Sequence, residues 1–142
     1  LYKDARCDLQ RLDSVCGPFG WQKAYQTIDG RLYCIVSIKN PETGEWVSKS
    51  DVGTESNTEA EKGQASDAFK RACVCWGSGR ELYSAPEILV KAQDTRIEKN
   101  AKGKLVCKDA FSVKSIGYDE NRNIVQLTIV NSRGNVVFKY NK

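Results

Sequence analysis

The chain has 142 residues, of which 40% are hydrophobic, and carries 22 basic and 18 acidic side chains for a net charge of +4. This length suits one domain with one sizeable core, and the three Trp, six Tyr and four Phe argue against intrinsic disorder. No apolar run approaches the roughly 20 residues of a membrane-spanning helix, and the charged, amphipathic start is unlike a signal peptide. We therefore expect a folded domain without a membrane partner.

Charge is distributed unevenly along the chain. Residues 1–69 carry 8 basic and 11 acidic side chains, whereas residues 70–142 carry 14 basic and 7 acidic ones. An asymmetry of this kind favours a polyanionic partner, although an ordinary solvated surface can also produce it.

Histidine is absent and there are six cysteines. The lack of histidine removes His-based acid–base chemistry and most catalytic metal sites. Only Cys73 and Cys75 are close in sequence, and they fall within a predicted helix instead of the paired knuckles of a zinc site. We expect reduced, structural cysteines and no metal, with a redox or zinc role for Cys73 and Cys75 as an alternative.

The first part of the chain predicts a short helix followed by three strands. Asp4 to Cys16 has apolar residues at helical spacing and ends before Gly17-Pro18. Asp29-Gly30 separates two β-favouring runs and predicts a two-residue hairpin. With "WVSKSDV" as a third strand, these runs predict an antiparallel meander over about residues 20–53.

A long amphipathic helix is expected next. Thr58 and Glu61 fit a capping box at its start, and Gly77 and Gly79 end it. Its apolar stripe consists of Ala65, Ala68, Phe69, Ala72, Cys73 and Trp76.

The remaining sequence predicts a connection and then a second small meander. We expect a helix around Pro86–Asp94, and an exposed, mobile loop over residues 98–108. Three β-rich runs then follow, at residues 111–118, 124–130 and 135–140. The prediction is an α+β fold in one DNA-binding domain over residues 1–142, with a β-β-β-α core at about 4–86, a β-rich extension at about 87–142, and one core shared by both meanders.

Two adjacent cations stand out on the long helix. Each residue of a helix advances by about 100°, so Lys70 and Arg71 project from opposite flanks of the exposed side. Gly63, Asp67 and Val74 lie between them and leave this side poor in charge. Either a neighbouring subunit or a phosphate-bearing ligand covers it, or it is a solvated face with two ordinary surface cations.

The segments "SDAFKRACVCWGSGRELY", "RLDSVCGPFGWQ" and "GEWVSKSDVGTESNTEAEKGQASDAFKRA" together resemble the Rad-fifty-two family of single-strand DNA annealing proteins, in its bacterial and phage (Sak-like) branch. The resemblance covers about residues 4–86. It implies a homo-oligomeric ring or filament that binds single-stranded DNA by its backbone and anneals complementary strands in recombination and repair. It also implies no nucleotide cofactor, no enzymatic activity, a bacterial or phage-infected cytoplasm, and a single-strand-binding protein as a further partner.

The resemblance assigns phosphate contacts to the adjacent Lys-Arg pair, here Lys70 and Arg71. A further contact from the family's first helix falls nearest to Arg6, and a family cation one turn past the pair falls on Val74 in this chain. Four other cations complete the predicted DNA-binding set: Lys62, Arg80, Lys102 and Lys104. The basic loop at residues 91–108 either holds a second strand or an incoming duplex, or is a solvated loop.

Alternative functions remain open at this point. The same fold can serve an end-protecting or scaffold protein with little annealing activity. A metal-dependent nuclease would need converging carboxylates, for which the candidates are Asp51, Glu55, Glu59 and Glu61. Three strand aromatics either stack on bases or belong to the core: Trp21, Tyr25 and Trp46.

Overall fold

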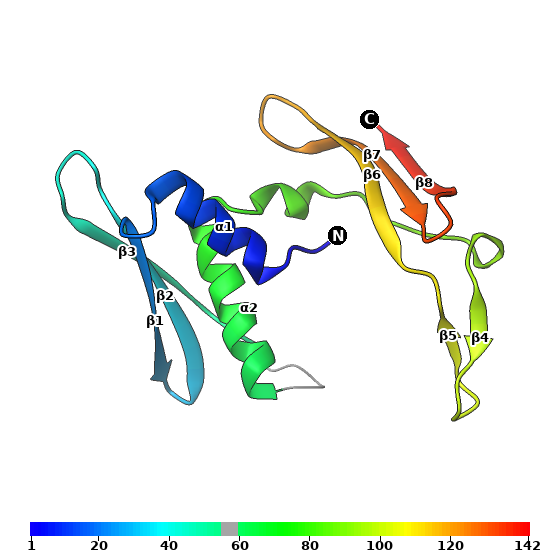
Figure 1. Ribbon diagram of the computed structural model, residues 1–142, viewed down its shortest axis with the longest axis horizontal. Helices are drawn as coiled ribbons and strands as arrows, with labels where there is room; N and C mark the ends of the chain where they lie inside the picture. Colours follow the sequence, from blue (N-terminus) through cyan, green and yellow to red (C-terminus); the bar gives the residue numbers. More distant parts are fainter. Residues whose placement is uncertain (55–59) are drawn as a thin grey trace. The chain divides into compact units, whose positions relative to one another are not determined.

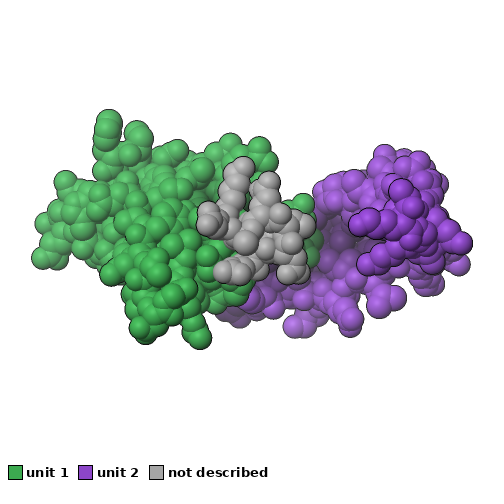
Figure 2. Space-filling model, turned by 90° about the horizontal axis from the view of Figure 1, so that it is seen from below, with its two compact units in different colours: residues 1–80 green, residues 81–142 purple. Residues whose placement is uncertain are grey.

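The structure, a computed structural model, describes the backbone of residues 1–54 and 60–142. It describes the side chains of residues 1–54 and 63–142. It divides into two compact units, unit 1 at Leu1–Arg80 and unit 2 at Glu81–Lys142 (Figure 2). The expected capping box at Thr58 and Glu61 lies outside the described residues. The α+β class predicted from the sequence is confirmed, and the assignment of the whole chain to one DNA-binding domain stays a prediction.

Unit 1 consists of two helices and a three-stranded antiparallel sheet in the order β1-β2-β3 (Figure 1). Its elements are α1 (Ala5–Cys16), β1 (Trp21–Ile28), β2 (Arg31–Lys39), β3 (Trp46–Val52) and α2 (Ala60–Cys75). Asp4 caps α1, because its carboxylate accepts a hydrogen bond from the Arg6 backbone N–H at 2.8 Å. The predicted first helix, meander and long helix are therefore present.

The β1–β2 hairpin is formed at the Asp29-Gly30 pair, as predicted. Both residues have positive φ, +49° for Asp29 and +73° for Gly30, which is the backbone conformation that a two-residue type I′ turn requires. This turn sets the register in which Trp21 pairs with Ile38 and Tyr25 pairs with Cys34.

The core of unit 1 lies between α2 and the helix-facing side of the sheet. On α2, the side chains of Ala68, Phe69, Ala72 and Cys73 are buried, which confirms the predicted apolar stripe. They meet Cys34 and Val36 of β2, while Leu12 joins them from α1. Burying these side chains fixes α2 on the sheet and orients its other side outward.

Gly53 lets the end of β3 approach α2 closely. A Cβ atom at this position would lie 2.2 Å from the backbone oxygen of Gln64 and 2.8 Å from the backbone nitrogen of Ala68. Only glycine fits between these backbone atoms without displacing one of them. The close approach holds Asp51, at the end of β3, beside α2.

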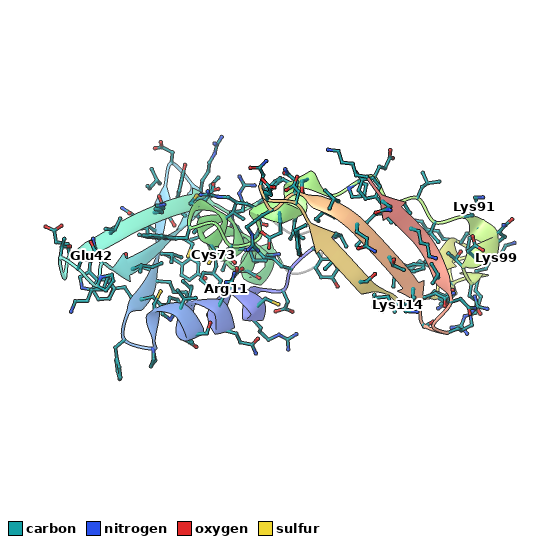
Figure 3. All side chains as sticks on the ribbon, turned by 90° about the horizontal axis from the view of Figure 1, so that it is seen from above. Arg11, Glu42, Cys73, Lys91, Lys99 and Lys114 are labelled. Carbon is teal, nitrogen blue, oxygen red and sulfur yellow. The ribbon has the colours of Figure 1, made fainter. Side chains whose placement is uncertain are left out.

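The six cysteines are free thiols, and only Cys34 and Cys73 have the buried position expected of structural cysteines. Cys34 and Cys73 are buried, and burial raises the pKa of the Cys73 thiol to about 12. Figure 3 labels Cys73 on α2. Since the thiolate is the reactive form, we predict that iodoacetamide at pH 8 modifies the exposed Cys7 and Cys107 and spares Cys34 and Cys73. Mass spectrometry of the native protein checks this, with urea-unfolded protein as the control. Equal labelling of Cys73 and Cys7 in the native protein would show that α2 does not stay on the sheet.

Unit 2 contains two antiparallel sheets. A two-stranded ribbon pairs β4 (Ile97–Lys99) with β5 (Leu105–Cys107), and a three-stranded sheet has the order β6-β7-β8 (Figure 1). The strands of the larger sheet are β6 (Phe111–Tyr118), β7 (Ile124–Asn131) and β8 (Val136–Asn141). The predicted second meander is therefore present. Its core is formed by Ile124, Leu127 and Ile129, against which Ala85 and Ile88 pack.

Three predictions for this half of the chain are wrong. The expected helix at Pro86–Asp94 is absent from the described residues; a 3-10 helix, η1, spans Arg80–Ser84, and a three-residue turn, η2, spans Ala92–Asp94. The segment between them is extended, because Ala85 and Ile88 cover the apolar core of the second sheet. The expected mobile loop at 98–108 is the β4–β5 ribbon. The two meanders have separate cores, since α1 and α2 cover the first sheet and residues 85–88 cover the second.

Candidate nucleic-acid interface

The outer side of α2 carries the two cations that the sequence singles out. Because the stripe opposite them is buried, Lys70 and Arg71 both lie on the part of the helix that faces away from the core. Arg71 is directed toward β3, where its Nη2 lies 3.5 Å from Asp51 Oδ1. Lys70 lies on the other flank, near the start of α1, where its charge lowers the pKa of Asp4. We call Lys70, Arg71 and Arg6 together the basic face of unit 1.

Arg71 is held in place and remains available to another anion. Its side chain is 43% exposed, and the ion pair with Asp51 is long and partly solvated. Pairs of this kind contribute about 0–1 kcal/mol. Its Nε atom is buried and has no hydrogen-bond partner among the described residues. This buried nitrogen is out of reach of a ligand, whereas the exposed part of the guanidinium, which Asp51 contacts at 3.5 Å, can meet another anion.

Arg6 is engaged by the residue that caps α1. Its Nε and Nη2 atoms donate to the two carboxylate oxygens of Asp4 at 3.0 and 2.9 Å. These bonds, with the backbone bond from Arg6, are the main reason why the pKa of Asp4 falls to about 2. Within the described part of the chain, Lys70 makes no salt bridge. Arg6, Asp4 and Lys70 thus form one charged group at the start of α1.

Asp67 and Val74 lie between the two cations on the outer side of α2. Asp67 accepts hydrogen bonds from the backbone N–H and the Oγ1 of Thr54, each at 3.0 Å, so its carboxylate ties the end of β3 to the helix. Val74 is half-buried and uncharged, at the position to which the sequence resemblance assigns a further cation.

The structure distributes the other predicted DNA-binding residues over different places. Arg80 donates from Nε to the Val74 carbonyl at 2.9 Å and from Nη2 to the Cys75 carbonyl at 2.8 Å. It therefore caps the C-terminus of α2, and this bonding accounts for it without DNA. The side chain of Lys62 lies outside the description. Lys102 and Lys104 belong to unit 2, in and beside the turn of the β4–β5 ribbon.

Two lysines of the sheet border α2 and were missed by the sequence reasoning. Lys23 Nζ lies 4.5 Å from the centroid of the Phe69 ring, and Lys49 Nζ lies 4.4 Å from the centroid of the Trp76 ring. Lys49 also donates to the Cys75 carbonyl at 3.1 Å. Both pair with Val36 of β2, whose side chain faces α2, so both lie on the helix-facing side of the sheet. Their spacing of two residues from Trp21 and Tyr25 in β1 and from Asp51 in β3 is a period-2 signal that the sequence contains.

A buried ionic cluster at the join of α1 and α2 was also missed. Asp8 is fully buried, and its Oδ1 accepts from Lys3 Nζ and from Ser78 Oγ, both at 2.6 Å. Lys3 donates as well to the Ser78 carbonyl at 2.8 Å. The sequence signal was the position of Asp8, which is four residues from Leu12 on the apolar stripe of α1. The cluster anchors the start of α1 to the end of α2.

The strand aromatics differ in their surroundings. Trp21 stacks on Phe69, with ring centroids 6.2 Å apart, and donates to Asp13. Tyr25 donates from its hydroxyl to the Ala65 carbonyl at 3.3 Å. Trp46 pairs with Lys39 on the face of the sheet opposite to Val36, and hence opposite to α2. These contacts favour packing roles for Trp21 and Tyr25, and place Trp46 away from the basic face.

Of the four carboxylates named for the nuclease hypothesis, only Asp51 has a described side chain. Asp51 is paired with Arg71, and the side chains of Glu55, Glu59 and Glu61 lie outside the description. Over residues 1–54 and 63–142, no three His, Cys, Asp or Glu side chains are grouped in a way that could hold a metal ion. Of the helices that the structure describes, none has the length and apolar character needed to cross a membrane.

The fold and the site geometry thus define a class of protein: an α+β unit whose long helix carries cations on its outer side. The model of the Rad52/22 family of double-strand break repair proteins matches residues 2–102. The chain belongs to this family, and the resemblance predicted from its sequence is confirmed at that level. The match includes unit 1 from Tyr2 onward and ends within the turn of the β4–β5 ribbon, so β5 and the β6–β8 sheet lie outside it.

Two curated proteins are also similar to this chain in sequence. The chain is 36% identical over 95 residues to the single-stranded DNA-binding protein DdrA of Deinococcus radiodurans. The aligned segment covers 66% of this chain and 44% of that protein. It is also 36% identical over 97 residues to DdrA of Deinococcus deserti, covering 67% and 47%. The chain therefore spans slightly less than half the length of these relatives. No solved structure matches it.

Proposed function

We propose that this protein binds single-stranded DNA through the phosphate backbone and promotes annealing of complementary strands in homologous recombination and repair, without ATP. The observation that carries the proposal is the basic face, where Lys70 has no salt bridge among the described residues and Arg71 has a weak one. Membership of a double-strand break repair family supports it. The printed name of the two DdrA relatives supports single-stranded DNA as the ligand.

The mechanism is physical and needs no catalytic residue. Cations fixed on a packed helix replace counterions along the strand and give affinity without sequence preference. Contacts restricted to phosphates leave the bases free to pair. A second strand then meets the first on a surface that offsets the repulsion between two polyanions, which raises the rate of encounter.

The proposal extends to assembly and partners. A homo-oligomer, as a ring or filament, would align the basic faces of several copies along one strand. A single-strand-binding protein is a further partner, and the site of action is the cytoplasm or nucleoid of a bacterium or a phage-infected host. Light scattering with and without an oligothymidine measures the assembly.

Binding through the backbone has a direct test. Fluorescence anisotropy with labelled oligothymidine, oligocytidine and a mixed sequence of equal length should give affinities within about threefold of one another. The logarithm of each affinity should fall linearly with the logarithm of salt concentration, by about 0.7 for each phosphate contact. Affinities that differ widely between sequences, or that do not respond to salt, would overturn the proposal.

Asp51 should compete with DNA for Arg71. In Asp51→Asn the ion pair is lost, while the amide oxygen can still accept the 2.7 Å bond that Val52 N–H makes to Asp51 Oδ1. A surface pair contributes at most about 1 kcal/mol, so single-strand affinity should rise two- to fivefold in an anisotropy titration. Glu42→Gln, in the exposed turn after β2, removes one negative charge elsewhere and serves as the control. An Asp51→Asn affinity equal to that of the control would mean that Arg71 does not contact phosphate.

A scaffold or end-protecting role on the same fold is the second candidate. It shares the basic face and the single-strand binding, so the binding titration does not separate the two. Only the rate of strand pairing distinguishes them.

A further inference from the structure

The β4–β5 ribbon of unit 2 is a defined structure. Beyond its paired strands, Lys108 N–H donates to the Arg96 carbonyl at 2.8 Å, and Asn100 N–H donates to the Lys104 carbonyl at 2.9 Å. The Asn100 side-chain oxygen accepts from the backbone N–H of Lys102 and of Lys104, both at 3.0 Å. Gly103 supplies the positive φ of +74° that closes the turn.

The base of the ribbon is tied to the larger sheet of unit 2. The Asp109 carboxylate accepts from Arg96 N–H at 2.7 Å and from Ser132 Oγ at 2.7 Å, and it lies 3.8 Å from the Arg133 guanidinium. Its side chain is 2% exposed. These hydrogen bonds lower the pKa of Asp109, so the carboxylate stays charged at neutral pH. The ribbon therefore has an anchored base and a free turn.

The net positive charge of the chain is concentrated on this ribbon. Unit 1 has eleven basic and eleven acidic side chains, and unit 2 outside residues 96–108 has six of each. Residues 96–108 have five basic side chains and one acidic side chain, which accounts for the net +4. Glu98 lies 3.6 Å from Arg96. The four lysines are exposed and make no salt bridge within the described residues: Lys99, Lys102, Lys104 and Lys108.

The shape and composition of the ribbon fit duplex DNA better than a single strand. A two-stranded β-ribbon fits into the major groove, where cations on both edges reach the two phosphate backbones. Extended grooves for single strands commonly add aromatic side chains that stack on bases, and residues 96–108 contain none. Register places Ile97, Lys99 and Leu105 on one face, and Leu105 is 63% exposed, so this face can make apolar contacts in a groove.

We infer that the β4–β5 ribbon is a duplex-binding arm, separate from the basic face of unit 1. It would hold double-stranded DNA, such as the product of annealing or the duplex beside a single-stranded end. This inference goes beyond the proposed function, because it concerns another unit and another form of DNA. It stands or falls independently of single-strand binding at Lys70 and Arg71.

The test compares two triple variants of the full chain. The ribbon variant is Lys99→Ala/Lys102→Ala/Lys104→Ala. Its matched control is Lys114→Ala/Lys139→Ala/Lys142→Ala, which removes three exposed lysines from the same unit outside the ribbon; Figure 3 labels Lys99 and Lys114, one from each set. Anisotropy is measured with a labelled blunt duplex and with oligothymidine of the same length, over a series of salt concentrations. Circular dichroism confirms that both variants are folded.

The ribbon variant should bind duplex at least about tenfold more weakly than the control. The salt slope for duplex should fall by about 2.7, since each lost phosphate contact contributes about 0.9, while oligothymidine affinity stays within about twofold. The inference is overturned if the wild-type chain does not bind duplex, if both triple variants lose the same affinity, or if single-strand affinity falls by the same factor. Unchanged duplex affinity with loss of binding to an acidic peptide would also overturn it, and would identify the ribbon as a protein-binding arm.

Discussion

Replacing Lys70 and Arg71 together by alanine is expected to lower single-strand affinity about a hundredfold. Each residue supplies a charge-assisted contact to phosphate of roughly 1.5 kcal/mol, and about 1.4 kcal/mol corresponds to a tenfold change. The salt slope should fall by about 1.4, which is two contacts at about 0.7 each on single strands. The side chains lie on the outer side of α2, so the core residues Phe69 and Cys73 stay in place.

The control for this variant is Arg11→Ala/Lys39→Ala. It removes two exposed cations from unit 1, one on α1 and one at the end of β2, and should cost less than threefold in affinity. Thermal unfolding of both double variants should match the wild type within a few degrees. A Lys70/Arg71 variant that binds like the Arg11/Lys39 variant would show that the basic face is not the DNA site.

Removing the buried carboxylate with Asp8→Ala should cause a large loss of stability in unit 1. The change leaves the Lys3 ammonium, whose side chain is 15% exposed, without its partner and leaves the Ser78 hydroxyl without its acceptor. Breaking a buried ion pair by removing one partner costs about 3–5 kcal/mol. We expect about 3 kcal/mol here, because Lys3 keeps some access to water and its bond to the Ser78 carbonyl.

Tryptophan fluorescence during urea unfolding isolates this effect. All three tryptophans of the chain, Trp21, Trp46 and Trp76, lie in unit 1, so the signal reports on that unit alone. Asp8→Asn keeps the volume and the acceptor for Ser78 and should lose less stability than Asp8→Ala. Glu42→Ala, at an exposed position, should change the free energy of unfolding by less than about 0.5 kcal/mol. A loss below about 1 kcal/mol for Asp8→Ala would contradict the anchoring role of the cluster.

Local sequence signals predicted most of unit 1, because these residue types and spacings favour one backbone conformation without help from distant contacts. Asp29-Gly30 specifies a turn whose positive φ values fix the β1–β2 register. The helical spacing from Ala68 to Cys73 specifies which side of α2 is buried. Once that side is known, the opposite placement of Lys70 and Arg71 follows from helix geometry.

The parts that sequence did not predict depend on contacts between distant residues. Asp8 looks like a misplaced charge on α1 until Ser78, seventy residues away, donates to it. The basic ribbon lacks strand-like alternation, and its order comes from the Asn100 side chain in the turn and from Asp109 bound to Ser132 at the base. In the same way, the sequence around Ala85 and Ile88 predicts a helix, but the segment is extended because both side chains pack against the apolar core of the second sheet.

The most direct test of the proposed function is a strand-pairing assay without ATP. Complementary oligonucleotides that carry a donor and an acceptor dye are mixed with protein at a concentration that saturates single-strand binding. We predict that wild-type protein accelerates pairing at least about tenfold over the spontaneous rate, and that Lys70→Ala/Arg71→Ala at equal concentration does not. Saturated binding with no acceleration would contradict annealing and would leave a scaffold or end-protecting role.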